Sequence, residues 1–173
     1  MNDRKWLFLR SQFLANAVSA ALGRANVYQH GATEENATLL GETLRSELLE
    51  LAGQYTGRVP DDDHVRNIRT LADRATARCG TFLDRGHLRF GVAQKALNLY
   101  LKFLWCADRI PAPPHCPFDS FVIGQLPSEV RVAWTKIEDE GPYLKLVKAA
   151  EAQAGDKSLA EWELSVYAEV GRR

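Results

Sequence analysis

The sequence predicts an all-α fold. Apolar residues recur at three- and four-residue spacings almost throughout the chain, and no sustained alternation of apolar and polar residues indicates a strand. The Asn-Gly and Asp-Gly pairs that favour tight hairpins are absent. A chain of 173 residues can bury one core and is short for two, so we expect one domain over residues 1–173, built from about seven helices.

Two helices are predicted before residue 58. The first runs from about Asp3 to Tyr28 and stops near Gly31, with a buried stripe of Phe8, Leu14, Val18 and Leu22. Thr33 is a suitable N-cap for the second, because its hydroxyl accepts a bond from a free backbone amide. The second stripe is Leu40, Leu44, Leu48 and Leu51, and Gly53 and Gly57 end this helix.

Pro60 and three consecutive aspartates, Asp61 to Asp63, introduce the third predicted helix, which continues to Cys79 and Gly80. Its apolar positions are Val65, Ile68, Leu71, Ala72 and Ala75. Three aspartates in sequence are compatible with a cation site or with the acidic start of a helix. The spaced oxygen ligands of a calcium loop are missing, which favours the helix start.

A central helix is expected from Phe90 to Ala107, because apolar residues cover most of its circumference. Four prolines between residues 111 and 117 then restrict the backbone and remove amide donors, so this loop should be rigid without being helical. We expect it to hold Phe118, Asp119 and Ser120 against the central helix. Asp119 is a suitable N-cap for a short helical segment that ends at Gln125.

Two or three helices are predicted to close the chain. The segment from Ser128 to Asp139 carries Val132 and Trp134 on one helix, and Pro142 lies in the first turn of the next. Residues 158–161, Ser-Leu-Ala-Glu, have the form of a capping box and start the last helix. The expected buried stripe of this helix is Trp162, Val166 and Val170.

Charge and cysteine content restrict the function classes. The formal net charge is zero, which weakens the case for a strong non-specific nucleic-acid binder. Residues 64–102 nevertheless carry eight bases and two acids, so this segment either forms a basic face or spreads its charges over solvated helix faces. An odd set of three cysteines argues for reduced thiols, and no export signal or membrane span is recognised, so we expect a cytoplasmic protein.

Two lysines interrupt the apolar central helix. Lys102 belongs to a narrow polar stripe that we expect to face solvent. Lys95 lies near the start of the helix, where partial burial would lower its pKa and make a neutral amine available as a nucleophile. Lys95 and Asp119 are therefore the first candidate site residues.

Residues 91–96, Gly-Val-Ala-Gln-Lys-Ala, and residues 118–123, Phe-Asp-Ser-Phe-Val-Ile, resemble the core motif of helix-hairpin-helix DNA glycosylases. The resemblance implies an all-α DNA-repair hydrolase that binds duplex DNA and flips a damaged base. Lys95 would attack the sugar C1′ and Asp119 would stabilise positive charge on the sugar. The corresponding DNA-binding candidates are Gly91, Gln94, Arg85, Arg89 and His115.

The match covers residues 91–126, with Ala93 in place of the second hairpin glycine and Phe121 in place of the histidine after the family's aspartate. The 24 positions between Lys95 and Asp119 also exceed the common interval. No four-cysteine iron–sulfur signature follows, and no cofactor is expected.

Two other interpretations stay open. Cys106, His115 and Cys116, with a ligand from Cys79, His87 or His64, would make a tetrahedral zinc site, but their spacing is unusual and we expect no metal. Cys79 and Cys106 are also explained as small core residues. The competing function class is a non-enzymatic helical interaction or regulatory protein with a protein partner, for which four tryptophans are possible interface anchors.

Overall fold

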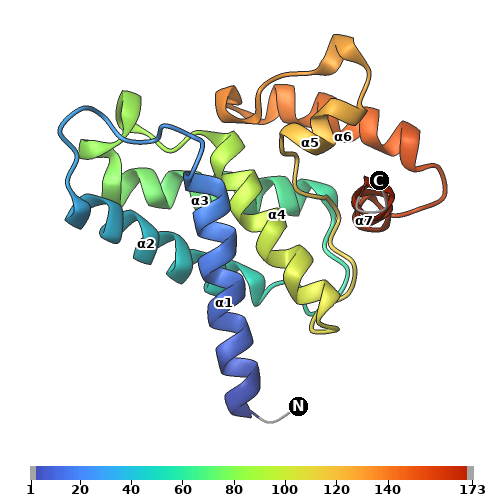
Figure 1. The fold of residues 1–173 in the computed structure, drawn as a ribbon, viewed down its shortest axis with the longest axis horizontal. Coiled ribbons are helices and arrows are strands. Elements are labelled where there is room, and N and C mark those ends of the chain that lie inside the picture. The colour runs from blue at the N-terminus through green and yellow to red at the C-terminus, as the bar shows by residue number, and fades with distance from the viewer. Residues whose placement is uncertain (1–2, 171–173) are drawn as a thin grey trace.

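The computed structural model describes residues 3–170, and this part of the chain forms seven α-helices and no β-ladder (Figure 1). The helices are α1 (Asp3–Leu22), α2 (Glu34–Ala52), α3 (Asp61–Cys79), α4 (Phe90–Cys106), α5 (Ser120–Gln125), α6 (Glu140–Ala154) and α7 (Leu159–Val170). The predicted all-α, single-domain fold is confirmed.

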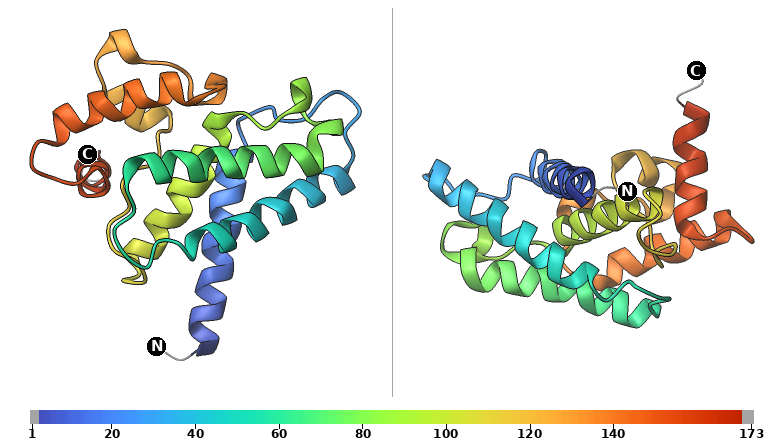
Figure 2. Two further views of the ribbon diagram at one scale, coloured as in Figure 1. Left: turned by 180° about the vertical axis from the view of Figure 1, so that it is seen from behind. Right: turned by 90° about the horizontal axis from the view of Figure 1, so that it is seen from below.

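Helix α4 is the centre of the molecule. It packs against α1, α2 and α3, while α5, α6 and α7 gather on the side of the molecule away from α2 (Figures 1 and 2). Five of its apolar side chains are fully buried: Val92, Ala93, Ala96, Leu97 and Leu101. A helix that is apolar around most of its circumference needs such neighbours on every side, so the prediction of a central helix is confirmed.

Local capping rules account for several helix starts. Thr33 accepts a bond from the backbone of Asn36, whose side chain accepts one from the Thr33 amide in return. Ser158 and Glu161 make the same reciprocal pair at the start of α7. The predicted stripe of α2, Leu40, Leu44, Leu48 and Leu51, is buried. Of the stripe predicted for α7, Trp162 is buried and Val166 half-buried, whereas the side chain of Val170 lies outside the described residues.

The first predicted helix was too long. Helix α1 ends at Leu22 and cannot reach Tyr28, because Asn26 adopts a left-handed backbone conformation with φ of 43°, and Gly31 after it has φ of 89°. Tyr28 instead forms an isolated antiparallel bridge with Leu83. Phe8, expected in the core, is 64% exposed, because the first turns of α1 extend beyond the other helices (Figure 1).

The helix predicted for Ser128 to Asp139 is also wrong. This segment makes two short 3₁₀ turns, Ser128–Val130 and Trp134–Lys136, joined by extended backbone. Its backbone is used in a long-range contact instead, since the Ile137 carbonyl accepts a bond from the Gly91 amide of α4 at 2.9 Å. The segment therefore covers the start of α4 and buries Trp134 and Ile137 there.

Candidate functional site

The fold brings Lys95 and Asp119 together across 24 positions of sequence. Lys95 lies in the second turn of α4, and Asp119 is the N-cap of α5. The distance from Lys95 Nζ to Asp119 Oδ2 is 3.9 Å, which is at the outer limit of an ion pair. The proline-rich loop sets this approach as expected, because α4 side chains bond to the loop backbone at Cys116 and Phe118.

The ammonium group of Lys95 is largely covered. Its Nζ lies 4.3 Å from the centre of the Trp134 ring, and its side chain is 11% exposed. Burial lowers the pKa of Lys95 below its ordinary value, Asp119 acts in the opposite direction, and the positive charge of Arg24 adds to the lowering. A lower pKa increases the share of neutral amine, which is the nucleophilic form.

Both carboxylate oxygens of Asp119 have partners. Oδ1 accepts bonds from the backbone amides of Phe121 and Val122, at 2.9 and 3.0 Å, and so caps α5. Oδ2 accepts a bond from the Tyr167 hydroxyl of α7 at 2.8 Å and faces Lys95. The carboxylate is therefore fixed in position by two helices, which serves stability and would also serve a reaction that needs a placed negative charge.

A second ion pair lies beside this one, and it corrects the expectation that Lys102 faces solvent. Lys102 Nζ is 2.6 Å from Glu163 Oε2, and the Glu163 side chain is only 2% exposed. Lys102 also lies 4.5 Å from the Tyr167 ring centre. Burial raises the pKa of Glu163 and the Lys102 charge opposes that rise. Lys102 thus joins α4 to α7.

Gly91 is a packing residue in this structure. A side-chain carbon built on it would overlap with the Trp134 carbonyl oxygen, and it is buried where the 127–139 segment crosses α4. Only glycine permits this approach of two backbones. Its amide, which the glycosylase resemblance assigns to a phosphate, donates to Ile137 O instead.

Gln94 and His115 are also buried. The Gln94 amide group bonds twice to the Phe118 backbone, donating to its carbonyl and accepting from its amide. His115 Nδ1 bonds to the Tyr143 hydroxyl at 2.7 Å. A DNA strand in solution cannot contact these two side chains while the fold stays closed.

The arginines between residues 64 and 102 do not form a free basic face. Arg85 pairs with Glu138 at 3.2 Å, and Arg89 pairs with Asp84 and bonds to carbonyls before α2. Three arginines of α3 have carboxylate partners as well: Arg66 with Asp63, Arg69 with Glu140, and Arg74 with Glu47 and Glu50. Nearby aspartates and the carboxylates of α2 and of residues 138–140 therefore neutralise much of the charge that the sequence concentrates in this segment.

The sequence did not single out three residues of the site. Trp134 covers Lys95, Tyr167 bonds to Asp119, and Arg24 adds a positive charge near the amine. Each comes from a segment more than 35 positions from its partner, and no local motif connects them. Arg24 is exposed and forms no ion pair with another described residue, so it is the cation available near Lys95.

The cysteines do not assemble a metal site in the described part of the chain. Cys79 and Cys116 are buried, whereas Cys106, expected in the core, is exposed. No group of three or more potential metal ligands occurs among the described residues. Neither Lys95 nor Asp119 lines any of five surface pockets found among the described residues.

The fold and site define an all-α protein with a covered lysine–aspartate pair between α4 and α5. Comparison with known proteins adds no family, because no family model, curated protein or solved structure matches the chain. None of the described helices combines the length and apolar character needed to cross a bilayer.

Proposed function

We propose that this chain is a DNA-glycosylase-like protein of the cytoplasm in which Lys95 and Asp119 form the reactive pair. The observation that supports the proposal best is the 3.9 Å approach of Lys95 Nζ to Asp119 Oδ2. The direction of the Lys95 pKa adds to it, because burial favours the neutral amine. Both residues also occupy the positions that the resemblance assigns to them.

In the proposed reaction the neutral amine of Lys95 bonds to C1′ of the damaged nucleotide as the bond from C1′ to the base breaks. The base leaves with that electron pair and takes up a proton. Loss of a proton from the new amine and opening of the sugar ring then give an imine between Lys95 and C1′. Asp119 stabilises the positive charge that develops on the sugar.

The reaction requires access to Lys95, which Trp134 now covers. Removal of a whole base needs the 127–139 segment to move, whereas an abasic site presents only a small aldehyde. Arg24 is the cation placed to bind a phosphate next to the amine. Activity on abasic DNA is therefore expected to exceed excision of an intact damaged base.

The test is borohydride trapping on duplexes that carry abasic, oxidised or deaminated sites. Wild-type protein should form a covalent adduct with abasic DNA, and Lys95→Ala should lower the yield by about 100-fold. Lys145→Ala, at an exposed lysine of α6, is the matched control and should leave the yield unchanged. An adduct that survives in Lys95→Ala, or no adduct on any duplex, contradicts the proposal.

A second candidate is a non-enzymatic helical interaction protein. It is favoured by two adjacent apolar side chains on the projecting end of α1, Leu7 and Phe8, which are 52% and 64% exposed. Residues behind them hold that end in place, since Phe13 stacks on Phe103 of α4 and Arg109 lies over Trp6. Absence of reaction with all of the abasic, oxidised and deaminated duplexes would favour this candidate.

Self-association gives a direct measurement for the second candidate. If α1 pairs with a second copy, sedimentation velocity should show a dimer that Phe8→Asp weakens by about tenfold or more, because the charge would be buried at the contact. Ser11→Asp, also exposed on α1, is the control for added charge. A monomer at all concentrations excludes pairing of two copies through this helix.

A further inference from the structure

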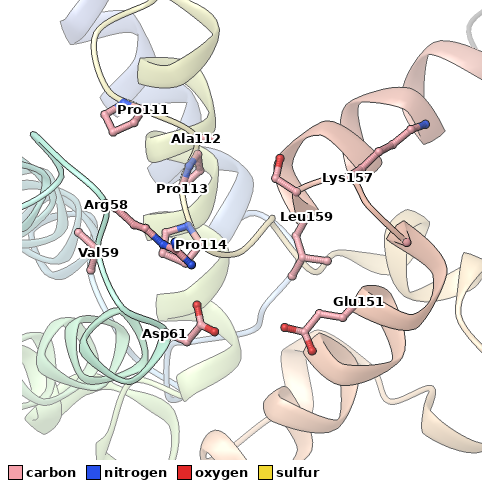
Figure 3. A pocket seen from close by; sticks show the side chains of 12 residues that line it. Arg58, Val59, Asp61, Pro111, Ala112, Pro113, Pro114, Glu151, Lys157 and Leu159 are labelled. Atoms are coloured by element: carbon pink, nitrogen blue, oxygen red, sulfur yellow. The ribbon is translucent and has the colours of Figure 1, made fainter.

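A separate pocket has neither Lys95 nor Asp119 in its lining. It has a volume of about 470 Å³ and is formed where the start of α3, the proline-rich loop and the turn between α6 and α7 meet (Figure 3). This volume lies within the range of small-molecule sites, and junctions between packed elements are where such sites commonly occur. The proposal below does not depend on Lys95 chemistry.

Three of the charged side chains at this pocket have no ion-pair partner among the described residues. Arg58, Glu151 and Lys157 border the pocket and form no ion pair with another described residue. A concave site with unpaired charges of both signs is suited to a ligand that also carries both signs.

The directions of these side chains separate the charges. The carboxylates of Asp61 and Glu151 point toward one another across the pocket, whereas the Arg58 guanidinium lies beside Pro114 (Figure 3). Lys157 points away from the pocket in the same view. Two carboxylates that face one another across a pocket suit a cation, and the Arg58 guanidinium has the donors that suit an anion.

A buried histidine without a hydrogen-bond partner on one ring nitrogen lies behind Asp61. His115 Nε2 has no hydrogen-bond partner, although the residue is only 1% exposed, and its nearest acidic atom is Asp61 Oδ1 at 3.8 Å. His115 Nδ1 lies 2.7 Å from the Tyr143 oxygen, which also accepts a bond from Asn98. In the tautomer in which the Tyr143 hydroxyl donates to Nδ1, His115 Nε2 carries a proton and faces the carboxylate that borders the pocket.

The rest of the wall is apolar and stiff. Pro111, Pro113 and Pro114 line one side, and Leu159 and Val59 line others. Proline fixes its own backbone angle, so this wall is formed before a ligand arrives and little order has to be gained on binding. Such a wall suits an aliphatic or aromatic side chain.

We propose that this pocket binds a small zwitterion with an apolar side chain, of the size of an amino acid or a dipeptide. The ammonium group of the ligand lies between Asp61 and Glu151. Its carboxylate binds Arg58, and its side chain packs against the prolines and Leu159.

Calorimetric titration with four named probes tests the proposal: L-leucine, L-phenylalanine, leucyl-leucine and phenylalanyl-leucine. At least one should bind at millimolar concentration or below. Glu151→Gln and Arg58→Met should each weaken that binding by about tenfold, because each removes one charge-assisted contact. Blocking the ligand's own charges, as in N-acetyl-leucine amide, should abolish binding.

Two controls keep the result interpretable. Arg58 and Glu151 are exposed, so their variants should retain the wild-type melting temperature, which separates loss of binding from loss of fold. Glu129→Gln, at an exposed carboxylate outside the pocket, should bind as wild type does. Absence of binding by all four probes, or full binding by both pocket variants, overturns the proposal and leaves the Lys95 test unaffected.

Discussion

Gly91→Ala is expected to destabilise the protein by about 3 kcal/mol, at the upper end of overpacking effects. The added methyl group would overlap with the carbonyl oxygen of Trp134 and come within 3.0 Å of the Ile137 Cβ. The first obstacle is backbone, which cannot rotate out of the way as the end of a side chain can. The 127–139 segment would have to separate from α4, and the bond from the Gly91 amide to Ile137 would be lost.

Urea unfolding of the variant measures this effect. Gly124→Ala is the matched control, because nothing lies within 4 Å of the added carbon on that helical glycine. Alanine should be neutral there or stabilising by about 0.5–1 kcal/mol. A stable Gly91→Ala variant that fails only to bind DNA would contradict the packing account and support a phosphate-binding role for Gly91.

Lowering the pH from 6.5 to 4 is expected to reduce the free energy of unfolding by about 3 kcal/mol through buried His115 alone. Protonation of His64 adds to this loss. The two rings pack edge to face, 4.7 Å apart. Burial lowers the pKa of His115 from 6.5 to about 4, although Asp61 opposes the shift. Burial and the neighbouring His115 lower that of His64 well below 6.5.

The stability falls with pH because the unfolded state takes up protons first. Unfolded histidines protonate near pH 6.5, whereas the buried rings stay neutral until about pH 4, so the unfolded state binds more protons in this window. The stabilising contribution is therefore complete above pH 6.5 and is lost as the pH falls. His87 acts in the opposite direction, since its bond to Glu138 raises its pKa, but its exposure keeps that effect small.

Urea unfolding at a series of pH values measures the stability, and NMR titration of the wild-type imidazoles identifies the residues. His87 should titrate above pH 6.5, whereas His64 and His115 should remain neutral at pH 5.5. Titration of His64 and His115 near pH 6.5, or a stability that is constant across the window, would contradict this account.

Local sequence patterns were sufficient to predict the buried stripe of α2 and the start of α7. The leucines of α2 follow the helical period and are buried, and the Ser158–Glu161 pair starts α7 as its spacing predicts. Such features depend on residues three or four positions apart, which a sequence presents directly. The helix predicted for residues 128–139 from the same local patterns was wrong, because the Ile137 backbone bonds to Gly91 of α4 instead of to its own neighbours.

The candidate site was predictable only in part. Lys95 near the start of an apolar helix and Asp119 after a rigid loop were both visible in the sequence, and the fold places them 3.9 Å apart. Partial burial of the amine was expected from the apolar helix, but the residue that covers it was not, because Trp134 comes from another segment. Lys102 was misplaced for the same reason, since its partner Glu163 lies 61 positions away in the chain.

The amino-acid order by itself determined an all-α chain, its main helices and the central position of α4, because periodicity and capping act within one helical turn. Only the tertiary structure decided which charges are paired and which backbones touch. Arg85 pairs with Glu138, Gly91 contacts Trp134, and Arg58 and Glu151 are left to face a pocket. These contacts join residues that are distant along the chain, and their energies depend on burial that exists only once the helices have packed.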